Sequence, residues 1–229
     1  MLRPRLALPL LATVLATPAM AADNVRLGMG LDPVISSFTL YYERYETGLA
    51  MGGNAVDTRI ERLGFSFSQP LARHLYGDVD LGYLATFQDD HPVIGDNDLD
   101  GGYLGVSLTG SYPLGEVFAL GSSLGYSYNW ADGEVNGVET DISWGEARAR
   151  AWTELRLPAA RLRIGVQGQH LDGEMTYETA PTQTFTFDAG NSTGAFAGID
   201  LYTSGAGRIS LYGQTGDREG FTLGFAADY

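Results

Sequence analysis

Cysteine and lysine are both absent from this chain of 229 residues. Without cysteine, the protein can form neither a disulfide framework nor a thiolate metal site. Without lysine, its positive charge comes from 14 arginines, which stand against 28 acidic residues and give a formal net charge of −14 at pH 7. This balance excludes binding to nucleic acid or other acidic polymers through bulk charge.

The sequence also lacks any uninterrupted run of apolar residues long enough to predict a transmembrane helix. A short apolar stretch over residues 6–16 follows Arg3 and Arg5 and precedes the Ala-Met-Ala of residues 19–21. A charged start, a short apolar core and an A-x-A site predict a secretory signal peptide over residues 1–21, with a membrane anchor as the alternative. Cleavage after Ala21 leaves residues 22–229 as one domain, with 12 arginines against 28 acidic residues and a net charge of −16.

What the sequence does contain is a period of two, in which apolar residues alternate with small or polar ones. This period is typical of β-strands. Several runs reach nine or more residues, which is the length that a tilted strand needs to cross a membrane. The ten predicted strands are approximately Ser37–Tyr45, Arg59–Ser68, Tyr76–Phe87, Tyr103–Tyr112, Val117–Trp130, Trp144–Leu157, Arg163–Leu171, Thr193–Tyr202, Arg208–Thr215 and Gly220–Tyr229.

The connections between these runs alternate in kind. Short turns such as PLGE and PAAR alternate with mostly longer, acidic stretches such as QDDHPVIGDNDLDG and ADGEVNGVETD. Short turns at one end and long loops at the other indicate an outer-membrane barrel with periplasmic turns and extracellular loops. A soluble β-sandwich has no reason to separate its loops in this way.

The two faces of the runs support the same interpretation. In the run 117–130, Phe118, Leu120, Leu124 and Tyr126 share one face, and the other face is Gly, Ser, Ala and Asn. A lipid-facing apolar band with aromatic residues near its ends, around a crowded interior, gives this pattern. The predicted fold class is therefore all-β, a closed antiparallel up-and-down transmembrane barrel of about ten strands. Eight strands is the alternative, if two of the weaker runs are not strands.

The end of the chain carries a resemblance to a known class. Apolar residues occupy every second position up to the last residue, at Phe221, Leu223, Phe225, Ala227 and Tyr229. In this the chain resembles the small outer-membrane β-barrels of Gram-negative bacteria, the OmpA-like and OmpX-like class. These five residues look like the C-terminal signal that the barrel assembly machinery recognises, although that class more often ends in Phe. The resemblance implies secretion to the periplasm, insertion as a monomer into the outer membrane, and contacts with its lipid and lipopolysaccharide.

Charged residues on the inward face form the first candidate site. They are Glu43, Arg62, Asp78, Asp80, Glu146, Arg148, Arg150, Glu154 and Arg208. A buried charge must be paired or hydrated, and side chains can nearly fill a barrel of this size. The preferred hypothesis is an arginine–carboxylate network that plugs the lumen, and the alternative is a narrow, porin-like channel whose lining sets ion selectivity.

Asp96, Asp98 and Asp100, followed by Gly101, match the start of a calcium loop. An EF-hand is excluded, because its bidentate glutamate would fall at Ser107 within a predicted strand. The remaining hypotheses are a looser Ca²⁺ site and an acidic, solvated loop. No other cofactor is implied.

Two enzyme classes on such barrels deserve comparison. The QDDH of residues 88–91 and the pair His170 and Asp172 would lie at the rim, as in omptin-like proteases, but the parity of the strand aims His170 outward. A general base must reach its substrate. Outer-membrane lipid A deacylases use a His/Ser pair, which His170 with Ser192 or Thr193 could imitate, but their His-x-Ser-Asn stretch is missing. Enzyme activity is therefore the third hypothesis.

A hairpin is predicted around Ala180 and Pro181, rising above the membrane as a continuation of the seventh and eighth strands. Its aromatic row of Tyr177, Phe185 and Phe187 either offers an edge to a partner or packs over the barrel mouth. The sequence as a whole predicts an outer-membrane barrel with a structural or surface-interaction role.

Overall fold

The computed structural model describes residues 36–51, 54–91, 95–135, 137–179, 181–203 and 206–229. The predicted signal peptide, residues 1–21, lies outside these ranges. No helix in the described ranges is long and apolar enough to cross a membrane. The strands are β1 (Ser37–Met51), β2 (Asn54–Ala72), β3 (Leu75–His91), β4 (Gly95–Pro113), β5 (Phe118–Val135), β6 (Val138–Leu157), β7 (Ala160–Tyr177), β8 (Gln183–Tyr202), β9 (Gly207–Gly216) and β10 (Arg218–Asp228).

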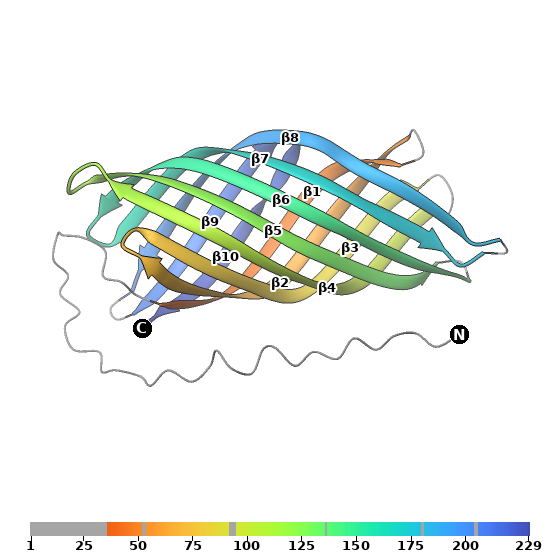
Figure 1. Cartoon of the computed structure of the whole chain (residues 1–229), viewed down its shortest axis with the longest axis horizontal. Coiled ribbons are helices and arrows are strands. Elements are labelled where there is room, and N and C mark those ends of the chain that lie inside the picture. Colours follow the sequence, from red (N-terminus) through yellow and green to blue (C-terminus); the bar gives the residue numbers. More distant parts are fainter. Residues whose placement is uncertain (1–35, 52–53, 92–94, 136, 180, 204–205) are drawn as a thin grey trace.

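Each strand pairs antiparallel with the next, and β1 pairs with β10 to close the ring (Figure 1). The closing register runs from Ser37 opposite Asp228 to Thr47 opposite Arg218. Closure leaves no free sheet edge around the ring, which lipid requires because it cannot satisfy unpaired backbone groups. The prediction of an antiparallel up-and-down barrel with ten strands is confirmed.

The strands are longer than predicted, and this corrects the expectation of long loops. β6 and β8 each contain 20 residues, and β4 begins at Gly95, so the stretch Asp96–Gly102 lies on a strand rather than in a loop. The acidic composition of this stretch predicts a loop, but Asp98 and Asp100 lie on the outward face of a continuing strand. We call the end with these extensions the upper end and the end with the short turns and Tyr229 the lower end.

The polarity of the wall inverts along the barrel. On β1, Leu40 faces outward in the lower part, whereas the outward residues further up include Arg44. Inside, the order is opposite, with Glu43 lower and Leu49 higher, and both are buried. The lower part therefore has the apolar outside of a membrane barrel, and the upper part has the apolar inside of a soluble one.

A hydrophobic core fills the upper part of the barrel. Three of its aromatic members, Tyr45, Trp144 and Tyr177, are at most 2% exposed. The core consists of Tyr45, Leu49, Met51, Val56, Ile60, Leu84, Leu99, Tyr103, Ala131, Ile142, Trp144, Leu171, Met175, Tyr177 and Phe187. These residues come from eight strands, β1 to β8, so side chains from all eight pack together inside the upper part.

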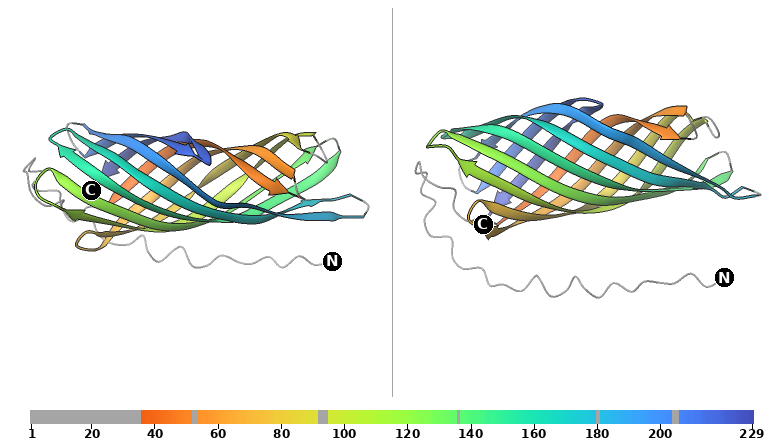
Figure 2. Two further views of the ribbon diagram at one scale, coloured as in Figure 1. Left: turned by 90° about the horizontal axis from the view of Figure 1, so that it is seen from above. Right: turned by 45° about the horizontal axis from the view of Figure 1, so that its top comes forward.

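The upper part also closes differently from the lower part. β9 and β10 contain only 10 and 11 residues, and above their hairpin β1 pairs directly with β8, at Ala50 opposite Asp188 and Met51 opposite Phe187. The register of β7 with β8 shifts between Asp188 and Gly190, and Gly190 has a φ of 62°. Such a bulge bends a strand, and it lies next to the residues of β8 that pair with β1. The barrel thus has ten strands below and eight above, and the β7–β8 hairpin projects furthest at the upper end (Figure 2).

Candidate functional site

An ion network crosses the lumen where the polar interior meets the apolar core. Glu146 on β6 is its centre and binds three arginines: Arg62 Nη2 lies 2.9 Å from Oε2, and Arg148 Nη2 and Arg218 Nη1 lie 2.5 and 2.7 Å from Oε1. The Glu146 side chain is 1% exposed, so it is shielded from water.

Glu43 on β1 contacts the same three arginines. Its distances are 3.3 Å to Arg62, 3.4 Å to Arg148 and 3.1 Å to Arg218. Two carboxylates therefore share three guanidinium groups, which come from β2, β6 and β10. We call these five residues the central network, and they carry a formal charge of +1.

Neutral groups complete the central network. Gln169 Oε1 accepts a hydrogen bond of 2.6 Å from Arg218, and Asn129 Oδ1 accepts one of 2.7 Å from Arg62. The Arg218 guanidinium also lies 3.1 Å from the ring centre of Tyr45, in a cation–π contact. Buried charges are tolerated when they are paired and hydrogen-bonded in this way.

A second network lies near the lower end. Glu154 on β6 accepts hydrogen bonds from Arg156 at 2.8 Å and Arg163 at 2.7 Å. Arg163 also pairs with Asp200 at 3.1 Å, and Asp200 accepts a hydrogen bond of 2.8 Å from Tyr212. This second network connects β6 to β9 along one wall, and Arg156 extends it to β4 by donating a hydrogen bond of 3.1 Å to Ser111 Oγ.

The sequence-predicted charges are distributed over these layers. Glu43, Arg62, Glu146 and Arg148 meet in the central network, and Glu154 belongs to the second network. Arg208 faces inward on β9 near the lower end. The remaining three, Asp78, Asp80 and Arg150, face the lumen between the two networks, where the described residues offer them no ion pair.

Sequence reasoning missed Arg218. The predicted last strand began at Gly220, which placed Arg218 in a short loop, but β10 begins at Arg218 and the side chain enters the central network. The alternation of the sequence could have identified it, because Arg218 shares the parity of Gly220 and Thr222 on the inward face of β10.

The suggested calcium ligands do not converge in the described part of the chain. Asp98 and Asp100 lie on the outward face of β4 and are exposed, and Asp100 accepts a hydrogen bond from the Tyr83 hydroxyl. The side chain of Asp96 lies outside the described residues. No group of three histidine, cysteine or acidic side chains among the described residues is arranged to hold a metal ion.

The residues considered for enzyme chemistry are on different faces. His170 points outward with its side chain 53% exposed, and its Nε2 lies 3.9 Å from Asp172 Oδ1. Ser192 faces inward and is 5% exposed, whereas Thr193 faces outward. The side chains of residues 89–91 are outside the described set. The structure therefore does not bring His170 and Ser192 together.

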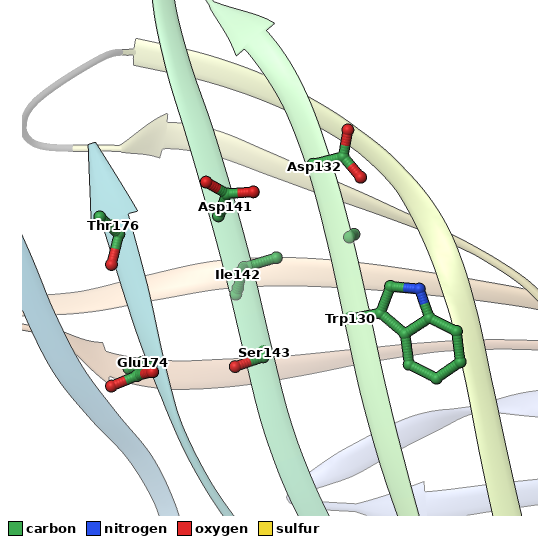
Figure 3. Close-up of a pocket in the computed structure, with 8 residues that line it drawn as sticks. Trp130, Asp132, Asp141, Ile142, Ser143, Glu174 and Thr176 are labelled. Atoms are coloured by element: carbon green, nitrogen blue, oxygen red, sulfur yellow. The ribbon is translucent and has the colours of Figure 1, made fainter. Parts of the chain in front are cut away.

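The outer face of the upper part is acidic. A hollow of about 160 Å³ lies across β5, β6 and β7. Figure 3 shows Asp132 and Asp141 above the exposed indole of Trp130, with Glu174 further along on β7. Asp132 is directly opposite Asp141 in the strand pairing. With Asp98, Asp100 and Asp172 also exposed, the upper part presents mainly negative charge to its surroundings.

The predicted hairpin of the seventh and eighth strands is present, and its aromatic row points inward. Tyr177 and Phe187 are 1% and 4% exposed and belong to the hydrophobic core, and Phe185 packs against them. The row therefore packs over the barrel mouth, which was one of the two alternatives, and does not form an exposed edge.

No protein-family model matches the chain, and no curated protein matches its sequence. Solved structures do match its fold. The translocator domain of the autotransporter NalP from Neisseria meningitidis is 9% identical with a TM-score of 0.52, and the match covers 88% of this chain and 91% of that one. The outer membrane protease OmpT from Escherichia coli is 7% identical with a TM-score of 0.53, covering 85% and 96%. The chain thus has the fold of a Gram-negative outer-membrane β-barrel.

Proposed function

We propose that the protein is a non-conducting outer-membrane barrel whose upper part serves as a rigid surface for contacts outside the cell. The proposal includes export through the periplasm and insertion as a monomer. The observation that carries it is the sealed interior, in which the central network lies directly below a packed apolar core.

Two layers oppose the passage of ions. An ion moving upward meets Glu43, Arg62, Glu146 and Arg218, whose side chains are at most 6% exposed. Above them it meets the hydrophobic core, and the buried charged side chains of the described residues all belong to the central network or lie below it. Transferring an ion into an interior of this kind is very unfavourable, because its hydration shell has no replacement.

The outer face of the upper part supports a role in surface contacts. Its acidic residues stand just above the aromatic level marked by Trp130, where lipopolysaccharide headgroups surround a barrel of an outer membrane. Divalent cations would bridge these carboxylates to anionic headgroups. We expect loss of the cations to loosen this contact, which a Ca²⁺ or Mg²⁺ dependence of thermal unfolding in lipopolysaccharide-containing vesicles would measure.

The last strand supports the proposed route of assembly. Phe221 and Phe225 are 41% and 50% exposed on the outward face of β10, and Tyr229 is 69% exposed. These side chains are accessible at the strand that closes the ring, which is the arrangement needed for recognition by the assembly machinery during insertion.

Ion conductance across a planar bilayer tests the proposal. Refolded mature protein, shown to be folded by its heat-modifiable gel mobility, should give no steady current steps. Gramicidin added afterwards to the same membranes provides the positive control. Reproducible steps from the protein would overturn the proposal in favour of the narrow channel, and neutralising Arg148 and Arg150 should then change its ion selectivity.

A further inference from the structure

The lumen between the two networks carries charges of opposite sign on different walls. Asp78 and Asp80 face inward from β3, and Arg150 faces inward from β6. Within the described residues, Asp78 accepts hydrogen bonds only from Ser107 at 2.8 Å and Thr109 at 3.0 Å, and Arg150 has no carboxylate partner. We call this region the lower lumen.

The lower lumen lies directly beneath the central network. Asp80 is within electrostatic range of Arg148 and Glu43, and Arg150 is within range of the same two residues. Arg148 itself is 21% exposed, whereas Arg62 and Arg218 above it are 4% and 1% exposed. The central network is therefore partly exposed on its lower side and buried on its upper side.

The two walls of the lower lumen differ in bulk. On β2 to β5 the inward residues are small, and they include Ser66, Gly105, Ser107, Ser123 and Gly125. On β6 to β9 the inward residues include the large side chains of Arg150, Trp152, Phe196 and Tyr212, and these aromatic rings cover the glycines of the same wall, Gly165 and Gly198. Small residues on one wall leave room beside that wall, which agrees with the partial exposure of Ser66, Asp78, Asp80, Ser107 and Ser123. Water can thus reach these side chains.

Arg150 is held in place with much of its donor capacity free. Its Nε donates to Gln167 Oε1 at 3.2 Å, and Gln167 Nε2 donates to Gln214 Oε1 at 3.1 Å. The Phe196 ring, 5.4 Å away, supports the guanidinium from one side. Among the described residues, no protein acceptor is shown for the two terminal nitrogens of Arg150, and the buried Nε2 of Gln214 also has no partner there. This set of donors suits a carboxylate ligand.

We propose that the lower lumen binds a small zwitterion, with its ammonium group towards Asp78 and Asp80 and its carboxylate towards Arg150. Both ends of such a molecule meet an unpaired opposite charge. A simple anion would meet the aspartates without compensation, and a simple cation would meet Arg150. The hydrophobic core closes the barrel above the site, so the proposed ligand would arrive from the lower, periplasmic end and would not cross the barrel.

Isothermal titration of the refolded full-length mature chain in detergent tests this inference. The probes are ω-amino acids of increasing length, from glycine to 6-aminohexanoate, with acetate and methylammonium as ligands that carry one charge each. We expect one zwitterion length to bind best with a stoichiometry of one, and acetate and methylammonium to bind at least about tenfold more weakly, since a hydrogen-bonded charge contributes about that factor or more.

Variants assign the binding to the proposed residues. Asp80→Asn and Arg150→Gln should each weaken binding of the best zwitterion at least about tenfold, whereas Arg73→Gln in the exposed β2–β3 turn should leave it unchanged. Ser123→Phe, directly opposite Arg150 in the strand pairing, should abolish binding by occupying the space without changing the charge. Circular dichroism and heat-modifiable mobility confirm that each variant is folded.

Three results would overturn the inference. The first is the absence of binding by any length of zwitterion to folded protein. The second is binding of acetate or methylammonium as tight as that of the best zwitterion, which would indicate an ordinary ion site. The third is unchanged affinity in the folded Asp80→Asn and Arg150→Gln variants.

Discussion

The substitution Glu146→Gln removes the hub of the central network while keeping the shape of the side chain. Glu146 contacts three arginines at 2.9, 2.5 and 2.7 Å, with a side chain that is 1% exposed. The change raises the formal charge of the network from +1 to +2 and leaves Glu43 as its only carboxylate. Removing one partner from a buried network costs about 3–5 kcal/mol of unfolding free energy, because the remaining charges stay buried without compensation.

Urea unfolding of the refolded barrel in detergent, followed by tryptophan fluorescence, measures this cost. The matched control is Glu46→Gln in the Arg44–Glu46 pair, whose side chains are 42% and 64% exposed and whose charged atoms lie 3.4 Å apart. An exposed pair contributes at most about 1 kcal/mol, so the two glutamates should differ severalfold. Equal losses for Glu146→Gln and Glu46→Gln would refute the idea that burial gives the network its effect.

A double-mutant cycle separates the pairing from the burial. Replacing Glu146 and Arg62 together by methionine keeps the network at +1 and removes one of its shortest contacts. Residues that share a network are not additive, so the double variant should be less destabilised than the sum of the single variants. Additive losses would mean that the two side chains act independently.

Three further predictions concern the upper part of the barrel. Trp144→Ala should cost about 3–5 kcal/mol in the same unfolding experiment, since Trp144 is 2% exposed in the core. The control Trp130→Ala should cost less than half as much, because Trp130 is 44% exposed. Equal costs would contradict the packed core. Gly190→Ala should cost about 1–2 kcal/mol because the φ of Gly190 is 62°. The added Cβ meets nothing closer than 3.9 Å, so the cost comes from the backbone conformation and not from a clash. The control Gly48→Ala, which adds a Cβ in open space, should be nearly neutral. Burial raises the pKa of Tyr177 from its ordinary value to about 12, so the folded state favours the neutral phenol. The contribution of this phenol to the free energy of unfolding is therefore complete below pH 10 and is lost as the pH rises towards 12. Between pH 10 and 12 the Tyr177→Phe variant should therefore lose about 2–3 kcal/mol less unfolding free energy than the unmodified protein. An equal loss in the two proteins would refute the assignment of this pH dependence to Tyr177.

The period of two in the sequence was sufficient to predict ten strands and their outward faces in the lower part. It failed over the acidic stretches, because residues such as Asp98, Asp100 and Gly101 are also typical of turns. In the structure Asn97 and Leu99 are 0% and 1% exposed and continue the inward parity of β4. The alternation persists through this stretch, but its outward residues are acidic, whereas the outward residues of the lower part of β4 are apolar. A rule that expects apolar residues on the outside does not recognise such a stretch as a strand.

The central network was predictable only in part for a different reason. Parity placed Arg148 and Glu146 inside, because that depends only on their own strand. The pairing of Glu43 with Arg218 depends on which residues of β1 and β10 reach the same level, and this is set by the tilt and stagger of the closed ring. The position of Arg218 as the first residue of β10 follows from the short β9–β10 hairpin, whose length no local pattern specifies.

The inversion of polarity along the wall also fixes how deeply the barrel sits in its bilayer. On β2 the outward residues change from Leu63 to Glu61 within one step, and on β5 they change from Trp130 to Asp132. Moving the barrel deeper into the bilayer by one such step would carry outward carboxylates into hydrocarbon. Moving it outward by one step would expose aromatic residues such as Trp130 to water. A barrel held in this way cannot adapt to a thicker membrane by sliding or by tilting as a single helix does. The bilayer must adjust its thickness to the protein, so hydrophobic mismatch should concentrate this protein in membranes, or membrane regions, of one thickness.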